Sequence, residues 1–160
     1  MDSDTNSAEQ EAVAATVTGD DLQQVGFRAM VMKNAIEFNL AGSATNKPDG
    51  SVEVTLQGNS DGINQTLDAM REGSKKSSQD NTVATTPIPF DANLKTFTIF
   101  QWTSTSRDIT TPYDLVFSMR PNNQEISRHD ARGIWNEIAL ITLKGEDREK
   151  FENHLQHDDE

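Results

Sequence analysis

Residues 40–57 read LAGSATNKPDGSVEVTLQ. Two runs in which small or apolar residues alternate with polar ones, 40–45 and 51–57, lie on either side of Pro48-Asp49-Gly50. Proline fixes φ and glycine tolerates a positive φ, so this tripeptide favours a tight turn. The segment therefore predicts a β-hairpin with Asn46 at the end of its first strand.

The residues that flank the hairpin predict two helices and a strand. In 27–39, apolar side chains recur three or four residues apart, which is the spacing of one face of a helix. Ser60 is a suitable N-cap for a second helix that ends near Gly73. Before both helices, 12–18 predicts a short strand that Gly19 ends. The apolar positions of the helices are Phe27, Met30, Val31, Ala35 and Phe38 in the first, and Ile63, Leu67 and Met70 in the second.

The second half of the chain predicts a long connection followed by two strands. Residues 73–93 are rich in Ser, Thr, Asn, Lys and Pro and have no period, so we expect a loop. Strand patterns return at 94–102 and 113–119. The order of elements, with one extra strand, predicts an α+β fold: a ferredoxin-like split βαβ sandwich with an antiparallel sheet and two helices on one face. In the strand 94–102, alternation places Phe97 and Ile99 on one face, and Phe100 and Trp102 on the other.

A further helix is predicted beyond Pro121. Ser127 and Asp130 fit the Ser-x-x-acid capping pattern, and an apolar face containing Ile134, Trp135 and Ile138 follows. We expect this face to pack the helix on the sheet; the alternative is that it binds a protein partner. The chain is thus divided into a disordered acidic N-terminus at 1–11, a folded domain at 12–120, and a helical C-terminal extension with an acidic tail at 121–160.

The charge of the 160-residue chain is concentrated at its ends. It has 26 acidic residues against 14 Lys and Arg, yet the segment 22–145 holds 13 acids and 12 bases. No contiguous basic field is present, which argues against nucleic acid as the partner. Cysteine is absent, which excludes thiol catalysis. No apolar run approaches the length of a membrane span and no basic-apolar leader opens the chain, so we expect no membrane association and a cytoplasmic location.

Arg28 is the first candidate for a functional residue. It lies at the start of the helix predicted over 27–39, directly after the loop 19–26. The opening turn of a helix has unpaired N–H groups and the positive end of the helix dipole, so it favours a compact dianion. An arginine there can contact two phosphate oxygens. Taken alone, such an arginine is more often an exposed surface residue, and we expect Arg28 to contribute little to packing.

Asn46 is the second candidate, because it ends the strand beside the predicted turn. In the split βαβ topology this strand end can lie near the loop before the first helix, where an amide offers both a donor and an acceptor to a water molecule. The alternative is that Asn46 opens the hairpin as an Asx-turn.

The two candidates belong to a longer pattern. Gln23-Gln24-Val25-Gly26-Phe27-Arg28, followed by GSATNKPDGSVEV at 42–54, resembles the acylphosphatase family. That family shows Q-G-V-x-F-R entering its first helix and then G-x-V-x-N-x-x-D-G-x-V-x-V, with the same interval between Arg and Asn. The resemblance covers about residues 12–120 and is specific in 22–58.

The resemblance implies a small hydrolase that cleaves acyl phosphates to a carboxylate and phosphate, without a metal or other cofactor. It assigns phosphate binding to Arg28 and orientation of the attacking water to Asn46. The expected partner is a small-molecule acyl phosphate. The backbone N–H groups that the resemblance places around the phosphoryl group are those of Gln23, Gln24, Val25, Gly26 and Phe27.

An alternative function follows from the departures from the family pattern. Gln24 stands where the family has glycine, which adopts a positive φ more readily than other residues. Asp20 and Asp21 bring two carboxylates close to the expected position of a dianion, and like charges repel. The alternative is a catalytically degenerate acylphosphatase-like module that binds an anion or a protein.

Overall fold

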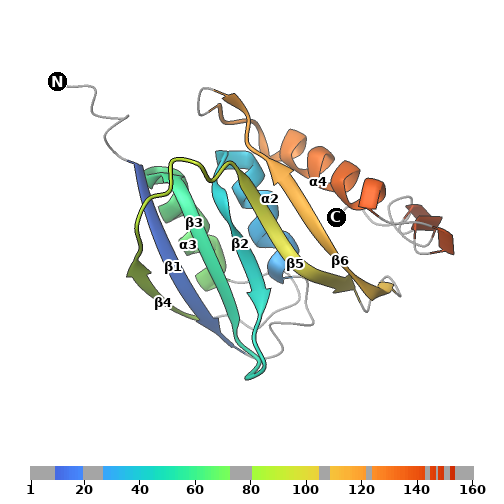
Figure 1. The fold of residues 1–160 in the computed structure, drawn as a ribbon, viewed down its shortest axis with the longest axis horizontal. Coiled ribbons are helices and arrows are strands. Elements are labelled where there is room, and N and C mark those ends of the chain that lie inside the picture. The colour runs from blue at the N-terminus through green and yellow to red at the C-terminus, as the bar shows by residue number, and fades with distance from the viewer. Residues whose placement is uncertain are drawn as a thin grey trace.

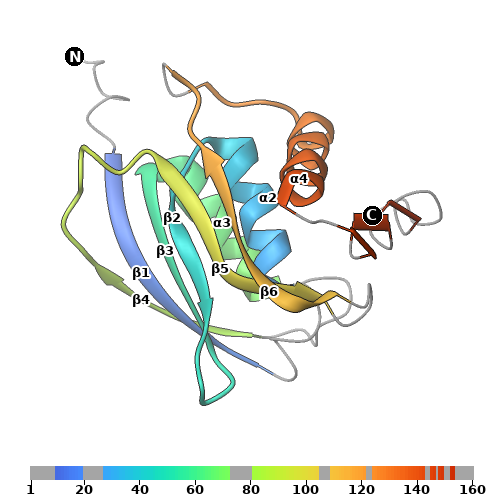
Figure 2. The same ribbon diagram turned by 45° about the vertical axis from the view of Figure 1, so that its right-hand side comes forward.

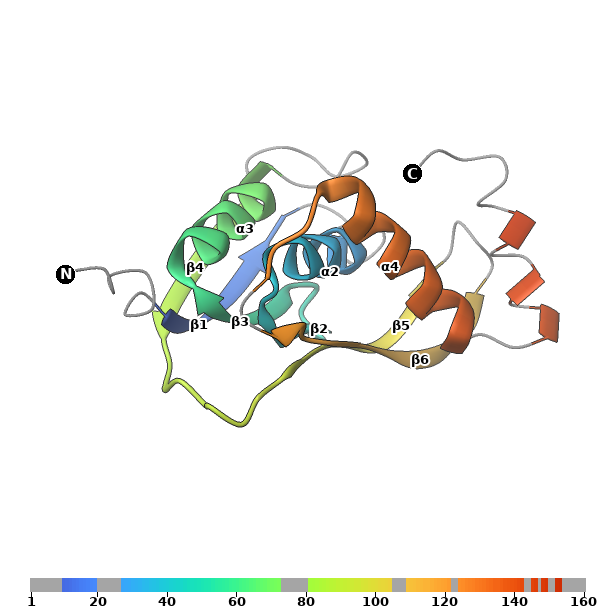
Figure 3. The same cartoon turned by 90° about the horizontal axis from the view of Figure 1, so that it is seen from above.

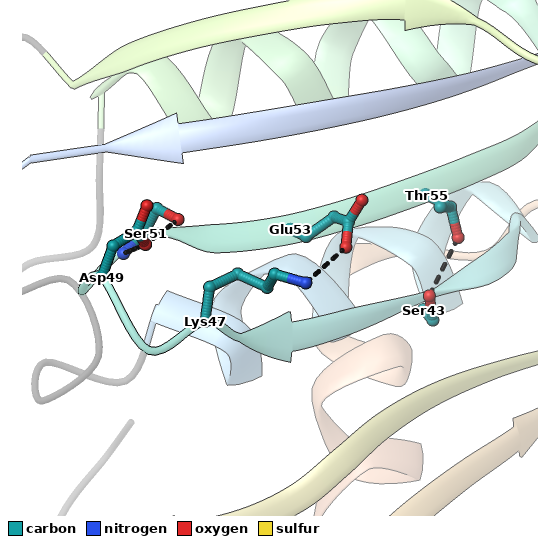
Figure 4. Close-up of polar contacts among 6 residues, drawn as sticks. All are labelled: Ser43, Lys47, Asp49, Ser51, Glu53 and Thr55. Carbon is teal, nitrogen blue, oxygen red and sulfur yellow. Dashed lines mark hydrogen bonds and ion pairs between the residues drawn. The ribbon is translucent and has the colours of Figure 1, made fainter.

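The hairpin predicted from residues 40–57 is formed by β2 (Ala41–Asn46) and β3 (Val52–Asn59). The strands pair antiparallel from Ala41 opposite Gln57 to Asn46 opposite Val52. In the turn, the carboxylate of Asp49 accepts hydrogen bonds from the backbone N–H of Ser51 at 3.0 Å and from its hydroxyl at 2.6 Å (Figure 4). These bonds lower the pKa of Asp49. Gly50 follows with φ 93°, as the tripeptide predicts.

The computed structural model describes residues 10–19, 27–72, 81–104, 109–121 and 124–142, with short segments at 145–146, 148–149 and 152–153. The described residues form one mixed sheet with the strand order β4-β1-β3-β2-β5-β6 (Figure 1). The other elements are β1 (Gln10–Thr18), α2 (Phe27–Phe38), α3 (Ser60–Glu72), β4 (Thr82–Pro87), β5 (Thr96–Ser104), β6 (Ile109–Ser118) and α4 (Arg128–Thr142).

The ferredoxin-like fold class is confirmed, but its fourth strand is β4 rather than the predicted strand at 94–102. β4 lies inside the predicted connection 73–93 and pairs antiparallel with β1, from Val13 opposite Pro87 to Thr18 opposite Thr82. Its side chains are mostly exposed, so its sequence carries no alternating pattern; the hydrogen bonds to β1 define it. β5 and β6 then extend the sheet on the other side, and β5 runs parallel to β2, so the sheet is mixed and not antiparallel throughout as predicted. β1 begins at Gln10, two residues earlier than predicted.

The faces of β5 also differ from the prediction. Phe97 and Ile99 are buried as expected, but Trp102 is buried with them at 3% exposure, whereas Phe100 is 43% exposed. The register shifts between Ile99 and Trp102, and Gln101 between them has φ 53°. One extra residue in β5 reverses the alternation, so Phe100 and Trp102 lie on opposite faces.

The core lies between one face of the sheet and the helices (Figure 3). On the opposite face, the connection from β4 to β5 passes across the sheet. It is bound to β3 by Gln57, whose side-chain amide donates to the carbonyl of Asp91 at 2.7 Å and accepts from its N–H at 2.8 Å. Within the described ranges, none of the helices is both long and apolar enough to cross a bilayer.

The C-terminal extension packs against the rest of the domain through α4. This helix lies beside α2 and over β6 (Figures 1 and 2). Its buried stripe consists of Ala131, Trp135 and Ala139, one turn apart, with Ile134 and Ile138 partly buried beside it. The Trp135 ring meets Trp102 of β5 edge to face, with centroids 5.9 Å apart. The apolar face therefore has an intramolecular partner, which includes α2 as well as the sheet.

The segment between β6 and α4 is fastened to the C-terminal end of α2. Asn39, with φ 57°, follows the helix, and its side-chain amide exchanges two 2.9 Å hydrogen bonds with the backbone of Arg120. The Arg120 guanidinium donates to the carbonyl of Ile36 at 2.8 Å. A cation that binds the last carbonyls of a helix also interacts favourably with the helix dipole.

Trp135→Ala tests whether the extension is part of the stable domain. Deletion of a fully buried indole against Trp102 is expected to lower the free energy of unfolding by about 3–5 kcal/mol in chemical denaturation. Glu137→Ala, an exposed change on the same helix, is the control and is expected to stay within about 0.5 kcal/mol of the parent. Equal stabilities for the two variants would contradict this packing.

Candidate functional site

The predicted phosphate-binding loop is described only at its end. Gln23, Gln24, Val25 and Gly26, like Asp20 and Asp21, lie outside the described residues. Phe27 is the first residue of α2, and its side chain is buried at 1% exposure in the core. Because Phe27 is fixed in this way, the position of the next residue, Arg28, is fixed with it.

Arg28 is buried, contrary to the expectation that it is an exposed helix-start residue. Its exposure is 6%, and its Nη1 donates to the carbonyl of Phe100 at 2.8 Å and to that of Gln101 at 3.4 Å. Both carbonyls belong to the irregular part of β5. The side chain therefore crosses from the first turn of α2 to β5, and its role in packing was missed because the two segments are 72 residues apart.

The guanidinium of Arg28 is a buried cation held by neutral groups. Burial lowers its pKa to about 10, which leaves it protonated at neutral pH. In the part of the chain that the structure describes, no carboxylate lies within ion-pair distance of it. A desolvated charge is costly until an opposite charge compensates it. The arrangement therefore favours an anion, and neither of the two hydrogen bonds uses Nη2 or Nε.

Asn46 is the last residue of β2 and lies opposite Val52. The Asx-turn of the hairpin is made by Asp49 and not by Asn46, so that alternative for Asn46 is wrong. The Asn46 Oδ1 atom is buried and has no hydrogen-bond partner among the described residues. A buried acceptor without a partner calls for a water molecule or another ligand.

The sheet brings the two candidates to the same end. Ala44 of β2 pairs with Ile99 of β5, so Asn46 and Gln101 each lie two residues beyond a paired position. Gln101 and its neighbour Phe100 hold Arg28. The opening of the loop 19–26 lies at this end too, because Val17 of β1 is opposite Val52, and Val52 is opposite Asn46. The topology therefore brings three separate segments together at one end of the sheet.

The polar contacts along the hairpin lie on the strand positions that alternate with the buried ones. Lys47 forms an ion pair with Glu53 at 3.4 Å, and the hydroxyls of Ser43 and Thr55 are 3.0 Å apart (Figure 4). The pair is about half exposed, so its contribution to stability is small. These contacts are compatible with the register that places Asn46 at the strand end. At Gly42, with φ 144°, an added Cβ would lie 1.9 Å from the carbonyl oxygen of Thr55, so glycine is required there.

Sequence reasoning missed the groups on β5 and β6 that hold Arg28. The carbonyls of Phe100 and Gln101 are backbone groups, so the amino-acid sequence gives no indication that they bind Arg28. Asp114 accepts a hydrogen bond from the Gln101 N–H at 2.9 Å, but in the sequence it is one acidic residue among many. In 97–102, which reads FTIFQW, Gln101 is a polar residue at a position where the alternation predicts a buried side chain.

The chain is similar to proteins of one known family. The acylphosphatase family model matches residues 13–99. The acylphosphatase of Mycolicibacterium smegmatis is 37% identical over 76 residues, which covers 48% of this chain and 76% of that protein. The acylphosphatase of Chlorobaculum tepidum is 35% identical over 78 residues, covering 49% and 84%.

Solved acylphosphatases share the fold. The structure from Coxiella burnetii aligns with a TM-score of 0.52 at 27% identity and covers 59% of this chain and 97% of that one. The structure from Bacillus subtilis aligns with a TM-score of 0.50 at 28% identity and covers 54% and 93%. The family match ends at Ile99, so β6 and α4 lie beyond it.

Inorganic phosphate is expected to raise the melting temperature of the parent, because a ligand that binds only the folded state stabilises it. The rise should shrink in Arg28→Lys, which cannot offer a planar fork, and vanish in Arg28→Met. Arg71→Met, at an exposed arginine of α3, is the matched control and should keep the full shift. The measurement is thermal unfolding with phosphate against sodium chloride at equal ionic strength. A full phosphate shift in Arg28→Met would contradict an anion site at Arg28.

Proposed function

The chain belongs to the acylphosphatase family of hydrolases, and we propose that it hydrolyses acyl phosphates at the end of the sheet where Arg28 and Asn46 lie. The observation that carries the proposal is the buried guanidinium of Arg28, which has two carbonyl partners and no carboxylate partner in the described ranges. An acyl phosphate supplies the missing negative charge.

Arg28 is proposed to bind the phosphoryl group. Its Nη1 is committed to the carbonyls of β5, so the plane of the guanidinium is fixed before substrate arrives. Nε and Nη2, which these two bonds do not use, are proposed to meet two phosphoryl oxygens as a fork. The backbone N–H groups of residues 23–27, at the start of α2, are proposed to bind the remaining oxygens. Phosphoryl transfer depends mainly on such charge stabilisation and positioning.

Asn46 is proposed to orient the attacking water through its Oδ1, which has no hydrogen-bond partner in the described part of the chain. The water oxygen forms a bond to phosphorus while the bond between phosphorus and the acyl oxygen breaks, and the electron pair leaves on the carboxylate. The acyl phosphate dianion and water thus give a carboxylate and dihydrogen phosphate, so charge and protons balance. Because a carboxylate is a good leaving group, no strong general base is needed.

Turnover of benzoyl phosphate is the direct test of the activity. The purified chain is expected to hydrolyse it, with equal rates in the presence and absence of EDTA, because none of the proposed roles needs a metal. Loss of activity with EDTA that a divalent ion restores would overturn the metal-independent mechanism. Phosphate binding without turnover would favour the degenerate anion-binding module instead.

Asn46→Ala separates the water-orienting role from phosphate binding. We expect kcat to fall by about 100-fold, which is the usual size of the effect when a group that positions a proton or a water molecule is removed. The inhibition constant of phosphate should stay within about threefold of the value for the parent. Asn136→Ala is the matched control, because Asn136 of α4 also has a buried Oδ1 without a partner. Steady-state kinetics with phosphate as inhibitor measure both quantities. If phosphate inhibition weakens and kcat does not change, Asn46 belongs to the phosphate site.

A further inference from the structure

The irregular part of β5 has an unusual hydrogen-bonding partner on β6. Ile99 pairs with Leu115 and Trp102 pairs with Tyr113, so Phe100 and Gln101 together face the single residue Asp114. This is a β-bulge with one extra residue. The Gln101 N–H donates to the side-chain carboxylate of Asp114 at 2.9 Å. The carboxylate thus satisfies a backbone donor that the bulge takes out of the ladder.

The peptide group that forms a hydrogen bond with Asp114 also forms one with Arg28. The carbonyl of Phe100 and the N–H of Gln101 belong to one peptide group, which is trans, so the two point in opposite directions. The N–H meets the Asp114 carboxylate, and the carbonyl accepts the 2.8 Å bond from Arg28 Nη1. Hydrogen bonds in a chain polarise one another, so an anion at the N–H end makes the carbonyl a stronger acceptor for a cation.

The conformation of Gln101 makes this support necessary. Its φ of 53° lies in the left-handed region, which a residue with a Cβ adopts at a cost. A peptide that turned back toward regular strand geometry would move the Phe100 carbonyl away from Arg28. The hydrogen bond to Asp114 opposes that turn.

We propose that Asp114 is a positioning residue for Arg28, acting through the Phe100–Gln101 peptide, so that the β6 strand beyond the family match helps to orient the phosphate-binding fork. The proposal rests on the proposed function of Arg28 as the phosphate ligand. Asp114 itself is exposed and is not proposed to touch substrate.

NMR of the Arg28 guanidinium tests the proposal without any need for turnover. With arginine labelled in ¹⁵N and ¹³C, a hydrogen-bonded Nη1 is expected to give separate Nη1 and Nη2 signals, assigned by their loss in Arg28→Lys. The signals should merge in Asp114→Ala and stay separate in Asp114→Asn, whose side-chain oxygen still accepts from Gln101. Asp68→Ala, which removes an exposed carboxylate from α3, is the matched control and should leave them unchanged. If Asp114→Ala does not fold, Asp114→Val removes the acceptor with a residue that favours strands.

Kinetics and phosphate titration give the second readout. In Asp114→Ala, phosphate affinity and kcat/KM should fall together by about tenfold, the size of one net hydrogen bond, and Asp114→Asn should recover most of the loss. Separate Arg28 signals and unchanged phosphate affinity in Asp114→Ala would overturn the proposal. An inactive parent whose Arg28 signals still depend on Asp114 would instead overturn the proposed function and leave the positioning contact standing.

Discussion

The hydrogen bonds from Arg28 to the carbonyls of Phe100 and Gln101 are the contact on which the candidate site depends. They join the first turn of α2 to the fifth strand, and they replace the hydration that a buried cation loses. Burial without a described counter-ion keeps the pKa of Arg28 low for an arginine. The same burial favours an anion at this position, because the described residues include no carboxylate that pairs with the guanidinium.

β6 and α4, which lie beyond the matched family region, are structurally connected to this contact. β6 completes the ladder on one side of β5, and its Asp114 holds the bulge from which the carbonyls project. α4 then covers β6 and buries Trp135 against Trp102, one residue after Gln101. The Asn39–Arg120 hydrogen bonds fasten the start of this extension to the far end of α2. The N-terminal end of α2 is therefore bonded to β5, and its C-terminal end is bonded to the segment between β6 and α4.

The hairpin of β2 and β3 positions Asn46, the second candidate residue, through contacts between residues that are close in sequence. Gly42 allows the backbones of β2 and β3 to approach, and the Asp49–Ser51 bonds close the turn, so the register is fixed within about 20 residues of chain. That register places Asn46 at the strand end with a buried oxygen that has no hydrogen-bond partner among the described residues. A buried polar atom of this kind is usually satisfied by a water molecule or a ligand.

The sequence by itself determined the helices and the hairpin and pointed to Arg28 and Asn46 as candidates, because each rests on spacing or turn chemistry within a short segment. It also predicted the ferredoxin-like fold class, but with the strand at 94–102 in the place that β4 occupies. The tertiary structure alone decided three features. β4 is a polar edge strand that only its pairing with β1 defines, Trp102 changes face because of a bulge, and Arg28 is buried rather than exposed. All three depend on hydrogen bonds that backbone groups make with parts of the chain outside their own segment. Nearly every residue has the same backbone carbonyl and N–H group, so no side-chain pattern predicts which of these groups will form a hydrogen bond.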